Sequence, residues 1–115
     1  MRISETEWIW HDGEFIKWND ARVHVMSHVL HYGSSVFEGI RCYSTKRGPA
    51  VFRLREHMQR FLNSAKVYRM NHDWSVDDFC DAAVELVCAI EIVNAWGYFA
   101  AGPFTDGLFE QLVIG

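Results

Sequence analysis

Long hydrophobic runs, a CxxC cysteine pair and basic residues after Arg69 are all missing from this sequence of 115 residues. No uninterrupted apolar run approaches the ~20 residues of a membrane-spanning helix, so we expect no membrane partner. The first residues include acids instead of the apolar segment of a secretory signal. The three cysteines are odd in number and form no CxxC pair, which favours reduced thiols in a cytoplasmic protein over a disulfide framework.

Basic residues are confined to the first part of the chain. Residues 1–69 contain all 11 lysines and arginines with 7 acids, and residues 70–115 contain the other 8 acids, which gives charges of +4 and −8. Because the basic part is mixed in sign and has no long cationic run, we expect no nucleic-acid partner. Half of the residues are hydrophobic and 23% are charged, which is typical of a globular protein. The length of 115 residues allows one domain at most.

Short aromatic and β-branched runs at residues 8–11 and 14–17 predict two strands. Asp12-Gly13 lies between them, and this dipeptide favours the type I′ turn of a hairpin. The alternation in Val23-His24-Val25 predicts a further strand. A second hairpin is expected from residues 40–43 and 50–52, with a turn between them at residues 46–49.

The hydrophobic period then changes to that of a helix. Residues 54–68 are predicted as an amphipathic helix. Its apolar stripe is Leu54, Met58, Phe61, Leu62 and Ala65. A second helix is predicted from Ser75, whose hydroxyl can cap the amide of Asp78. Its stripe is Val76, Phe79, Cys80, Ala83, Val87 and Ile90. A last strand is expected near residues 96–100.

This order of elements, strands followed by two helices, predicts an α+β fold. We expect a mostly antiparallel sheet with the two amphipathic helices packed on it. Such an architecture does not specify a function.

The histidine, glycine and cysteine motifs do not predict a metal site, a nucleotide-binding loop or a catalytic nucleophile. His24, His28 and His31 would line up on a helix as metal ligands, but the first lies in an expected strand and no acid or thiol joins them by spacing, so no metal is expected. The glycines of GSSVFEG match neither a Walker loop nor GxGxxG. Cys42 lies in an expected strand, where packing is the usual role of a cysteine, so we do not expect it to act as a nucleophile.

Arg60 has two interpretations from spacing alone. Its guanidinium fork suits bidentate binding of a phosphate or carboxylate, in a locally cationic part of its helix. However, Glu56 stands four residues earlier, and i,i+4 ion pairs are common on helices. Spacing by itself favours the ion pair.

Two long motifs resemble a known family. HVMSHVLHYGSSVFEGIR (residues 24–41) and FRLREHMQRF (residues 52–61) are similar to the N-terminal domain of branched-chain amino acid aminotransferases, pyridoxal-phosphate enzymes of fold type IV. The resemblance covers about residues 8–88, so we predict an aminotransferase domain at 1–88 and a divergent tail at 89–115. Relatives that act on D-amino acids, or are lyases, usually have an acidic GDGVYE-like motif where this chain has YGSSVFEG.

The resemblance implies a role for each matched position. Arg60 would bind the phosphate of pyridoxal 5′-phosphate, which reverses the expectation from spacing. Phe37 would be a wall of the pocket for a branched aliphatic side chain, Gly39 would let substrate approach the backbone, and Arg41 would fix polar groups. Tyr32 would reach the active site of a partner subunit in a homodimer. The complete enzyme would transfer an amino group from leucine, isoleucine or valine to 2-oxoglutarate, a 2-keto acid.

Two departures from the family pattern concern the catalytic base and the tail. The family's lysine, which forms the Schiff base with the cofactor and moves the proton, belongs to a second domain. Lys17, Lys46 and Lys66 have no matching context, so the chain alone is expected to be an inactive fragment with weak or absent cofactor binding. A Tyr-Ile-Arg-Pro strand is replaced by residues 94–99, and no arginine follows Arg69.

These departures suggest that the tail arose from a frameshift, truncation or assembly artefact, which sequencing of the locus would test. The alternative is a non-catalytic binding or dimerisation domain derived from the family.

Overall fold

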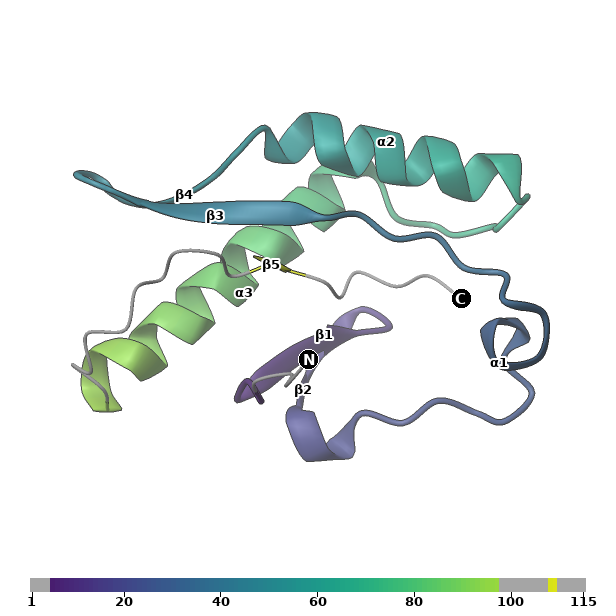
Figure 1. Cartoon of the computed structure of the whole chain (residues 1–115), viewed down its shortest axis with the longest axis horizontal. Coiled ribbons are helices and arrows are strands. Elements are labelled where there is room, and N and C mark those ends of the chain that lie inside the picture. The colour runs from purple at the N-terminus through teal and green to yellow at the C-terminus, as the bar shows by residue number, and fades with distance from the viewer. Residues whose placement is uncertain (1–4, 98–107, 110–115) are drawn as a thin grey trace.

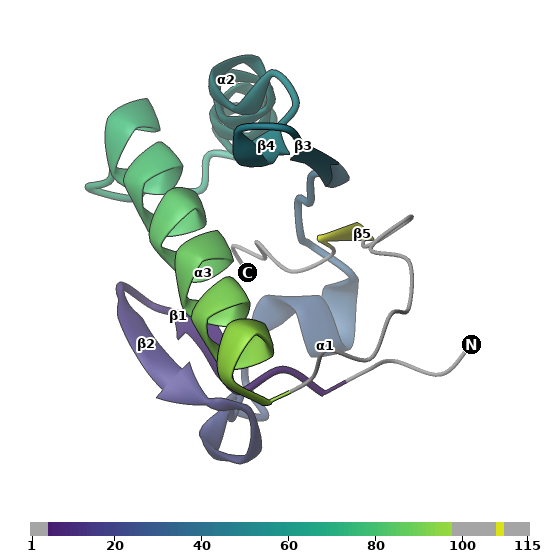
Figure 2. The ribbon, with the colours of Figure 1, turned by 90° about the vertical axis from the view of Figure 1, so that its left-hand side faces the viewer.

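A computed structural model describes residues 5–97 and 108–109, and the structural statements below refer to this part of the chain. Its elements are β1 (Trp8–His11), β2 (Glu14–Lys17), the 3-10 helix η1 (Trp18–Asp20), α1 (His28–Tyr32), β3 (Ile40–Thr45), β4 (Gly48–Val51), α2 (Leu54–Val67), α3 (Val76–Gly97) and β5 (Leu108–Phe109). Helix α2 follows the β3–β4 hairpin along the chain and packs against α3, and α3 extends from α2 toward the β1–β2 hairpin, where it contacts β1 (Figures 1 and 2). No helix among these residues is sufficiently long and apolar to cross a bilayer.

The first hairpin forms as predicted. Strands β1 and β2 pair antiparallel, with Trp8 opposite Lys17 and His11 opposite Glu14. Both turn residues have positive φ, 53° at Asp12 and 90° at Gly13, as a type I′ turn requires. Asp and Gly tolerate this region better than other residues, so local chemistry specifies the turn.

The remaining strands form a second sheet of order β4-β3-β5. Strands β3 and β4 pair antiparallel, with Cys42 opposite Val51, and the return strand begins at Gly48, before the expected residue 50. Strand β5, which the sequence did not predict, pairs with β3 through Ile40 and Phe109. The α+β class is thus confirmed, with the described antiparallel strands divided between two small sheets.

The strand predicted at Val23-His24-Val25 is wrong. Both valines are mostly exposed, at 61% and 64%, and no strand pairs with them in the part that the structure describes. The chain turns instead, because the amide of Ser27 donates to the carbonyl of His24 at 2.9 Å. The alternating pattern of Val23-His24-Val25 thus does not form a strand, because no described strand lies beside it to pair with. The short helix α1 follows the turn.

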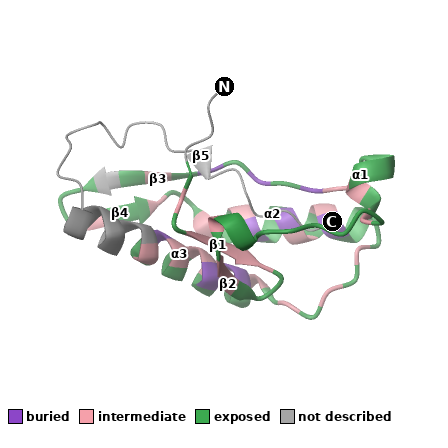
Figure 3. Cartoon of the chain, turned by 90° about the horizontal axis from the view of Figure 1, so that it is seen from below, coloured by how far each residue is buried: buried purple, intermediate pink, exposed green. Residues whose placement is uncertain are grey.

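Helices α2 and α3 supply most of the core. The predicted face of α2 is confirmed, since Met58, Phe61 and Ala65 are fully buried. On α3, Phe79 is fully buried and Val87 nearly so. Figure 3 shows the buried positions along both helices and in the segment that leads into β3.

The start of α3 is the capping box that the sequence predicted. The amide of Asp78 donates to the hydroxyl of Ser75 at 3.2 Å, and the amide of Ser75 donates to the Asp78 carboxylate at 2.6 Å. Each side chain thereby satisfies an amide that the first helical turn leaves without a partner. The hydrogen bonds that Ser75 donates also lower the pKa of Asp78.

The far end of α3 differs from the prediction. Trp96 and Gly97 are helical, so the strand expected near residues 96–100 is wrong at its start, and residues 98–100 lie outside the described part. The aromatic composition of this stretch favours a strand, but the helix continues from Val76 without interruption. The predicted domain boundary at residue 88 falls within α3 and stays a prediction.

Candidate functional site

An extended segment that leads from α1 into the first residues of β3 carries three of the five candidate residues. Exposure alternates along it, as expected where successive side chains point to opposite sides. The buried positions are Val36, Glu38 and Ile40, each at 4–5% exposure, and the exposed positions are Phe37, Gly39 and Arg41. The segment therefore presents the three candidates on one open side and packs the other side against the core.

Glu38 connects this segment to α2. Its carboxylate is 4% exposed and accepts hydrogen bonds from Arg60, through Nε at 2.5 Å and Nη2 at 2.6 Å. It also accepts a hydrogen bond from Nδ1 of His57 at 2.8 Å. The hydrogen bonds from Arg60, aided by His57 and opposed by burial, hold the pKa of Glu38 below its ordinary value. Glu38 correspondingly raises the pKa of Arg60, so both groups are charged at neutral pH.

Arg60 retains donors for a further anion. Glu38 occupies the edge formed by Nε and Nη2, which leaves both Nη1 protons and one Nη2 proton of the five in a guanidinium. The side chain is 66% exposed, so this remaining edge is open to solvent. A phosphate or carboxylate fits such an edge in a bidentate arrangement, and the arginine therefore suits the cofactor phosphate.

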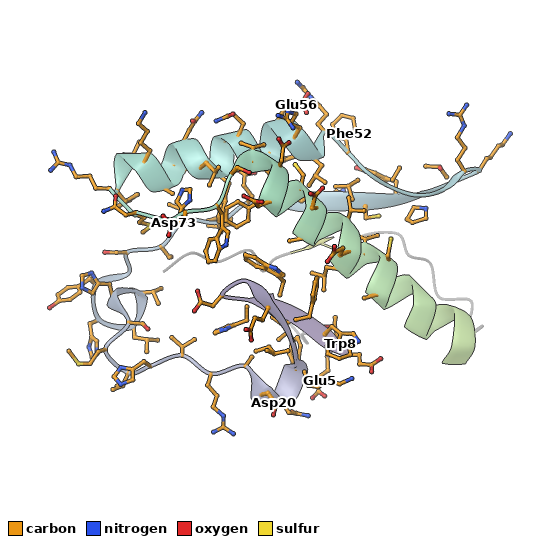
Figure 4. All side chains as sticks on the ribbon, turned by 180° about the vertical axis from the view of Figure 1, so that it is seen from behind. Glu5, Trp8, Asp20, Phe52, Glu56 and Asp73 are labelled. Carbon is orange, nitrogen blue, oxygen red and sulfur yellow. The ribbon has the colours of Figure 1, made fainter. Side chains whose placement is uncertain are left out.

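The alternative from spacing, an ion pair between Arg60 and Glu56, is wrong. Glu56 instead accepts a hydrogen bond from Nε of Arg53 at 3.0 Å. Figure 4 shows Glu56 beside Phe52 at the N-terminal end of α2. Arg60 has bonded to the buried carboxylate 22 residues away, where water competes less for the bond.

Tyr32 lies in α1, outside both the extended segment and α2. It ends α1, is 77% exposed, and packs edge-on against His28 with ring centroids 5.4 Å apart. A surface hollow of about 440 Å³ lies near this helix, and none of the five candidates lines it. Its lining residues are Met26, Ser27, His28, Ser34, Tyr68 and Met70. Within the described residues, Phe37, Gly39 and Arg41 thus lie on an open face and not in an enclosed pocket, and Tyr32 and Arg60 lie on other elements.

Metal-ligand clusters of three or more histidine, cysteine or acidic side chains are not found in the part that the structure describes. Of the three spaced histidines, only His28 and His31 share a helix, and His31 Nε2 bonds to the carbonyl of Val25 at 2.7 Å. Cys42 lies within β3, as the sequence indicated.

Comparison with known proteins reveals close relatives over most of the chain. No protein-family model matches it. The branched-chain-amino-acid aminotransferase of Salmonella typhimurium is 49% identical over 96 residues, which are 84% of this chain and 31% of that protein. The crystal structure of the Escherichia coli enzyme superposes with a TM-score of 0.73 at 52% identity, covering 76% of this chain and 29% of that one. Over this region, the chain is a homologue of the branched-chain aminotransferases.

The branched-chain aminotransferase from T.th. is a further structural neighbour. It was solved in complex with N-(5′-phosphopyridoxyl)-L-glutamate, and it is 49% identical with a TM-score of 0.70 over 73% of this chain and 28% of its own. The family resemblance inferred from the motifs is therefore confirmed. The chain spans about a third of the length of the curated branched-chain aminotransferases that it matches. The roles of the five candidate residues within such an enzyme stay predictions.

Sequence reasoning missed Glu38 and His57 as members of this candidate site. A signal for Glu38 existed, because it stands between Val36 and Ile40 in an alternating segment and is therefore a charge on an apolar face. Such a charge needs a partner. His57 and Arg60 lie three residues apart on one helix, which lets both reach the same acceptor. The sequence could not say which acceptor that is.

Proposed function

We propose that this chain supplies the phosphate-binding arginine and one wall of the substrate site of a branched-chain aminotransferase. The proposal rests mainly on the bond between Arg60 and Glu38, because it joins a cationic group to the segment that presents Phe37 and Gly39. The homology to branched-chain aminotransferases supports the reaction that the sequence resemblance implied, which we propose to be amino transfer from leucine, isoleucine or valine to 2-oxoglutarate.

Arg60 binds the cofactor phosphate in this proposal. A dianionic phosphate is well matched by a fixed guanidinium edge, and the T.th. relative was solved with a phosphopyridoxyl ligand. When bound, pyridoxal 5′-phosphate supplies the electron sink for chemistry at the amino acid Cα. The contribution of Arg60 is to hold the phosphate end of that group in place.

Phe37, Gly39 and Arg41 contact the substrate in this proposal. Phe37 is 74% exposed and offers an apolar surface to a branched side chain. At Gly39, no described residue beyond the adjoining ones lies within 4 Å of where a Cβ would stand, which supports an approach of substrate to the backbone there. The T.th. enzyme was also solved with 4-methylvaleric acid, a branched aliphatic acid, which supports this assignment.

The catalytic lysine is not supplied by this chain in our proposal. The sequence contains Lys17, Lys46 and Lys66. Lys17 is engaged elsewhere, since its Nζ pairs with Glu7 at 2.5 Å and lies 3.6 Å from the ring centroid of Trp8. We therefore propose that the 115-residue chain catalyses no amino transfer alone and binds the cofactor weakly, through its phosphate.

The test compares cofactor binding with and without the phosphate. Pyridoxal 5′-phosphate and pyridoxal are titrated against the 115-residue chain, with binding followed by ¹H–¹⁵N NMR. We expect weak binding of the phosphorylated form only, and its loss in Arg60→Ala. Exposed Arg47→Ala, in the turn before β4, is the matched control and should bind normally. Equal binding of both compounds, or no effect of Arg60→Ala, would refute the phosphate site.

A second assay tests the inactivity of the chain alone. Leucine, 2-oxoglutarate and pyridoxal 5′-phosphate are incubated with the chain, and glutamate is measured. We expect no formation above the protein-free mixture. Formation that depends on one of the three lysines would show that this chain carries the base.

The exposed apolar residues around α1 favour a second candidate function, a homodimerisation domain. Five residues between positions 23 and 32 are 58–77% exposed, which is more than scattered single exposures account for. They are Val23, Val25, Met26, Leu30 and Tyr32. A surface of this kind suits a second copy of the chain, in agreement with the dimer that the resemblance implied.

Analytical ultracentrifugation tests the dimer. We expect dimers that Leu30→Glu dissociates, whereas Val67→Glu, at an 80% exposed position of α2, should leave them intact. A monomeric chain at all concentrations would refute the second candidate without affecting the phosphate site.

A further inference from the structure

Glu38 is an unusual residue for the place it occupies. Among the described residues it is the one buried side chain that carries a charge, and its neighbours Val36 and Ile40 belong to the core. Burial of an ionised carboxylate is costly unless other groups bond to it. Three hydrogen bonds from α2 compensate the cost here, two from Arg60 and one from His57.

The arrangement determines the direction of the Arg60 guanidinium. The group is planar, so bonds at both Nε and Nη2 specify where Nη1 points. An arginine without such a partner samples many rotamers and loses that freedom when it binds an anion. A side chain that is already held has less to lose.

His57, which lies on α2 with Arg60, also bonds to the Glu38 carboxylate. With the proton on Nδ1, it donates to Oε2 of Glu38 at 2.8 Å, and it is only 21% exposed. Glu38 is thus held on both oxygens, because Arg60 Nε bonds to Oε1. The segment that carries Phe37 and Gly39 is thereby tied to the helix that carries Arg60.

We propose that Glu38 is a positioning residue, which holds the free edge of Arg60 toward the cofactor phosphate and keeps it in register with the substrate face. This inference rests on the proposed function, since it assumes that Arg60 binds the phosphate. Glu38 itself does not touch the ligand.

The sign of one binding change tests the inference. Glu38→Gln removes a negative charge near the phosphate, so electrostatics alone would strengthen binding of pyridoxal 5′-phosphate. Loss of the ordered guanidinium would weaken it, and we expect a weakening of about 3- to 10-fold. Glu56→Gln is the matched control, because it removes a carboxylate from α2 that bonds to Arg53 and not to Arg60. Its affinity should stay within about 2-fold of the unaltered chain.

An NMR measurement on the unaltered chain tests the inference even if Glu38→Gln folds poorly. The Nε–H resonance of Arg60, identified by its loss in Arg60→Lys, should be a single protected signal in the unliganded chain. His57→Gln leaves the buried carboxylate charged and should shift this signal and weaken phosphate binding, by less than Glu38→Gln does. An Nε–H signal in fast exchange with water in the unaltered chain would overturn the inference.

The outcomes separate the two proposals. If Arg60→Ala abolishes phosphate-dependent binding and Glu38→Gln leaves it unchanged or strengthens it, Glu38 does not position the arginine and the proposed function stands. If the unaltered chain does not distinguish pyridoxal 5′-phosphate from pyridoxal, both proposals fail. Weakening in Glu38→Gln and none in Glu56→Gln supports both.

Discussion

Phe79 is the side chain whose removal should cost this domain most. It is fully buried, and four aromatic rings meet it at centroid distances of 5.5–6.2 Å. These rings belong to Trp10, Phe61, His72 and Trp74. Phe79→Ala would leave a cavity at the point where β1, α2 and α3 meet.

The magnitude follows from this packing. Replacing a buried phenylalanine by alanine costs about 3–5 kcal/mol, and the edge-to-face ring packing that disappears with Phe79 favours the upper part of that range. Domains of this size have a total unfolding free energy of about 5–15 kcal/mol, so the loss is a large fraction of the stability of the domain. At a urea dependence of about 2 kcal/mol per M, the midpoint should fall by roughly 2 M.

Urea unfolding followed by tryptophan fluorescence measures this loss, because Trp10 and Trp74 adjoin Phe79. The control is Val84→Ala on the same helix, where the side chain is 49% exposed. We expect this control to cost less than about 1 kcal/mol. A Phe79→Ala loss within about 1 kcal/mol of the control would refute the assignment of Phe79 as the centre of the core.

Two further predictions concern Glu38 and the glycines. The pKa of Glu38 is lower in the folded chain than its ordinary value of 4.5, so its stabilising contribution is complete above that pH and disappears as pH falls through the folded value. Urea midpoints should therefore fall less on acidification in Glu38→Gln than in the unaltered chain, and parallel curves would contradict the bond network. Gly33→Ala should cost about 1–2 kcal/mol, because Gly33 has a φ of +65°, whereas Gly39→Ala should be nearly neutral in the same titration. Equal losses at both positions would show that backbone conformation is not the cause.

Elements with strong local signals were predictable from sequence. Asp12-Gly13 specified its turn because few residue pairs accept positive φ twice. The apolar period of residues 54–68 predicted α2 to within one residue, and Ser75 with Asp78 predicted where α3 begins. In each case the decisive contacts lie within a few residues, so the sequence contains both partners side by side.

Elements that depend on distant partners were not predictable in the same way. Val23-His24-Val25 has the pattern of a strand and forms none, because strand formation requires a second strand to bond with. Strand β5 has only two residues, too few to show a strand pattern in the sequence, and it is defined by its pairing with β3. Likewise, helix α3 continues through Trp96 and Gly97, where the aromatic composition predicted a strand.

For the candidate site too, the sequence motifs predicted one part and only the fold decided the other. Its motifs were sufficient to indicate the branched-chain aminotransferases, because they are long and specific, and the roles of Arg60, Phe37 and Gly39 that follow from them stay predictions. Spacing assigned Arg60 to Glu56, and the fold assigned it to Glu38 instead. The reason is physical: an exposed neighbour four residues away offers a screened ion pair, whereas a buried carboxylate 22 residues away must be bonded, and only the folded chain brings it within reach.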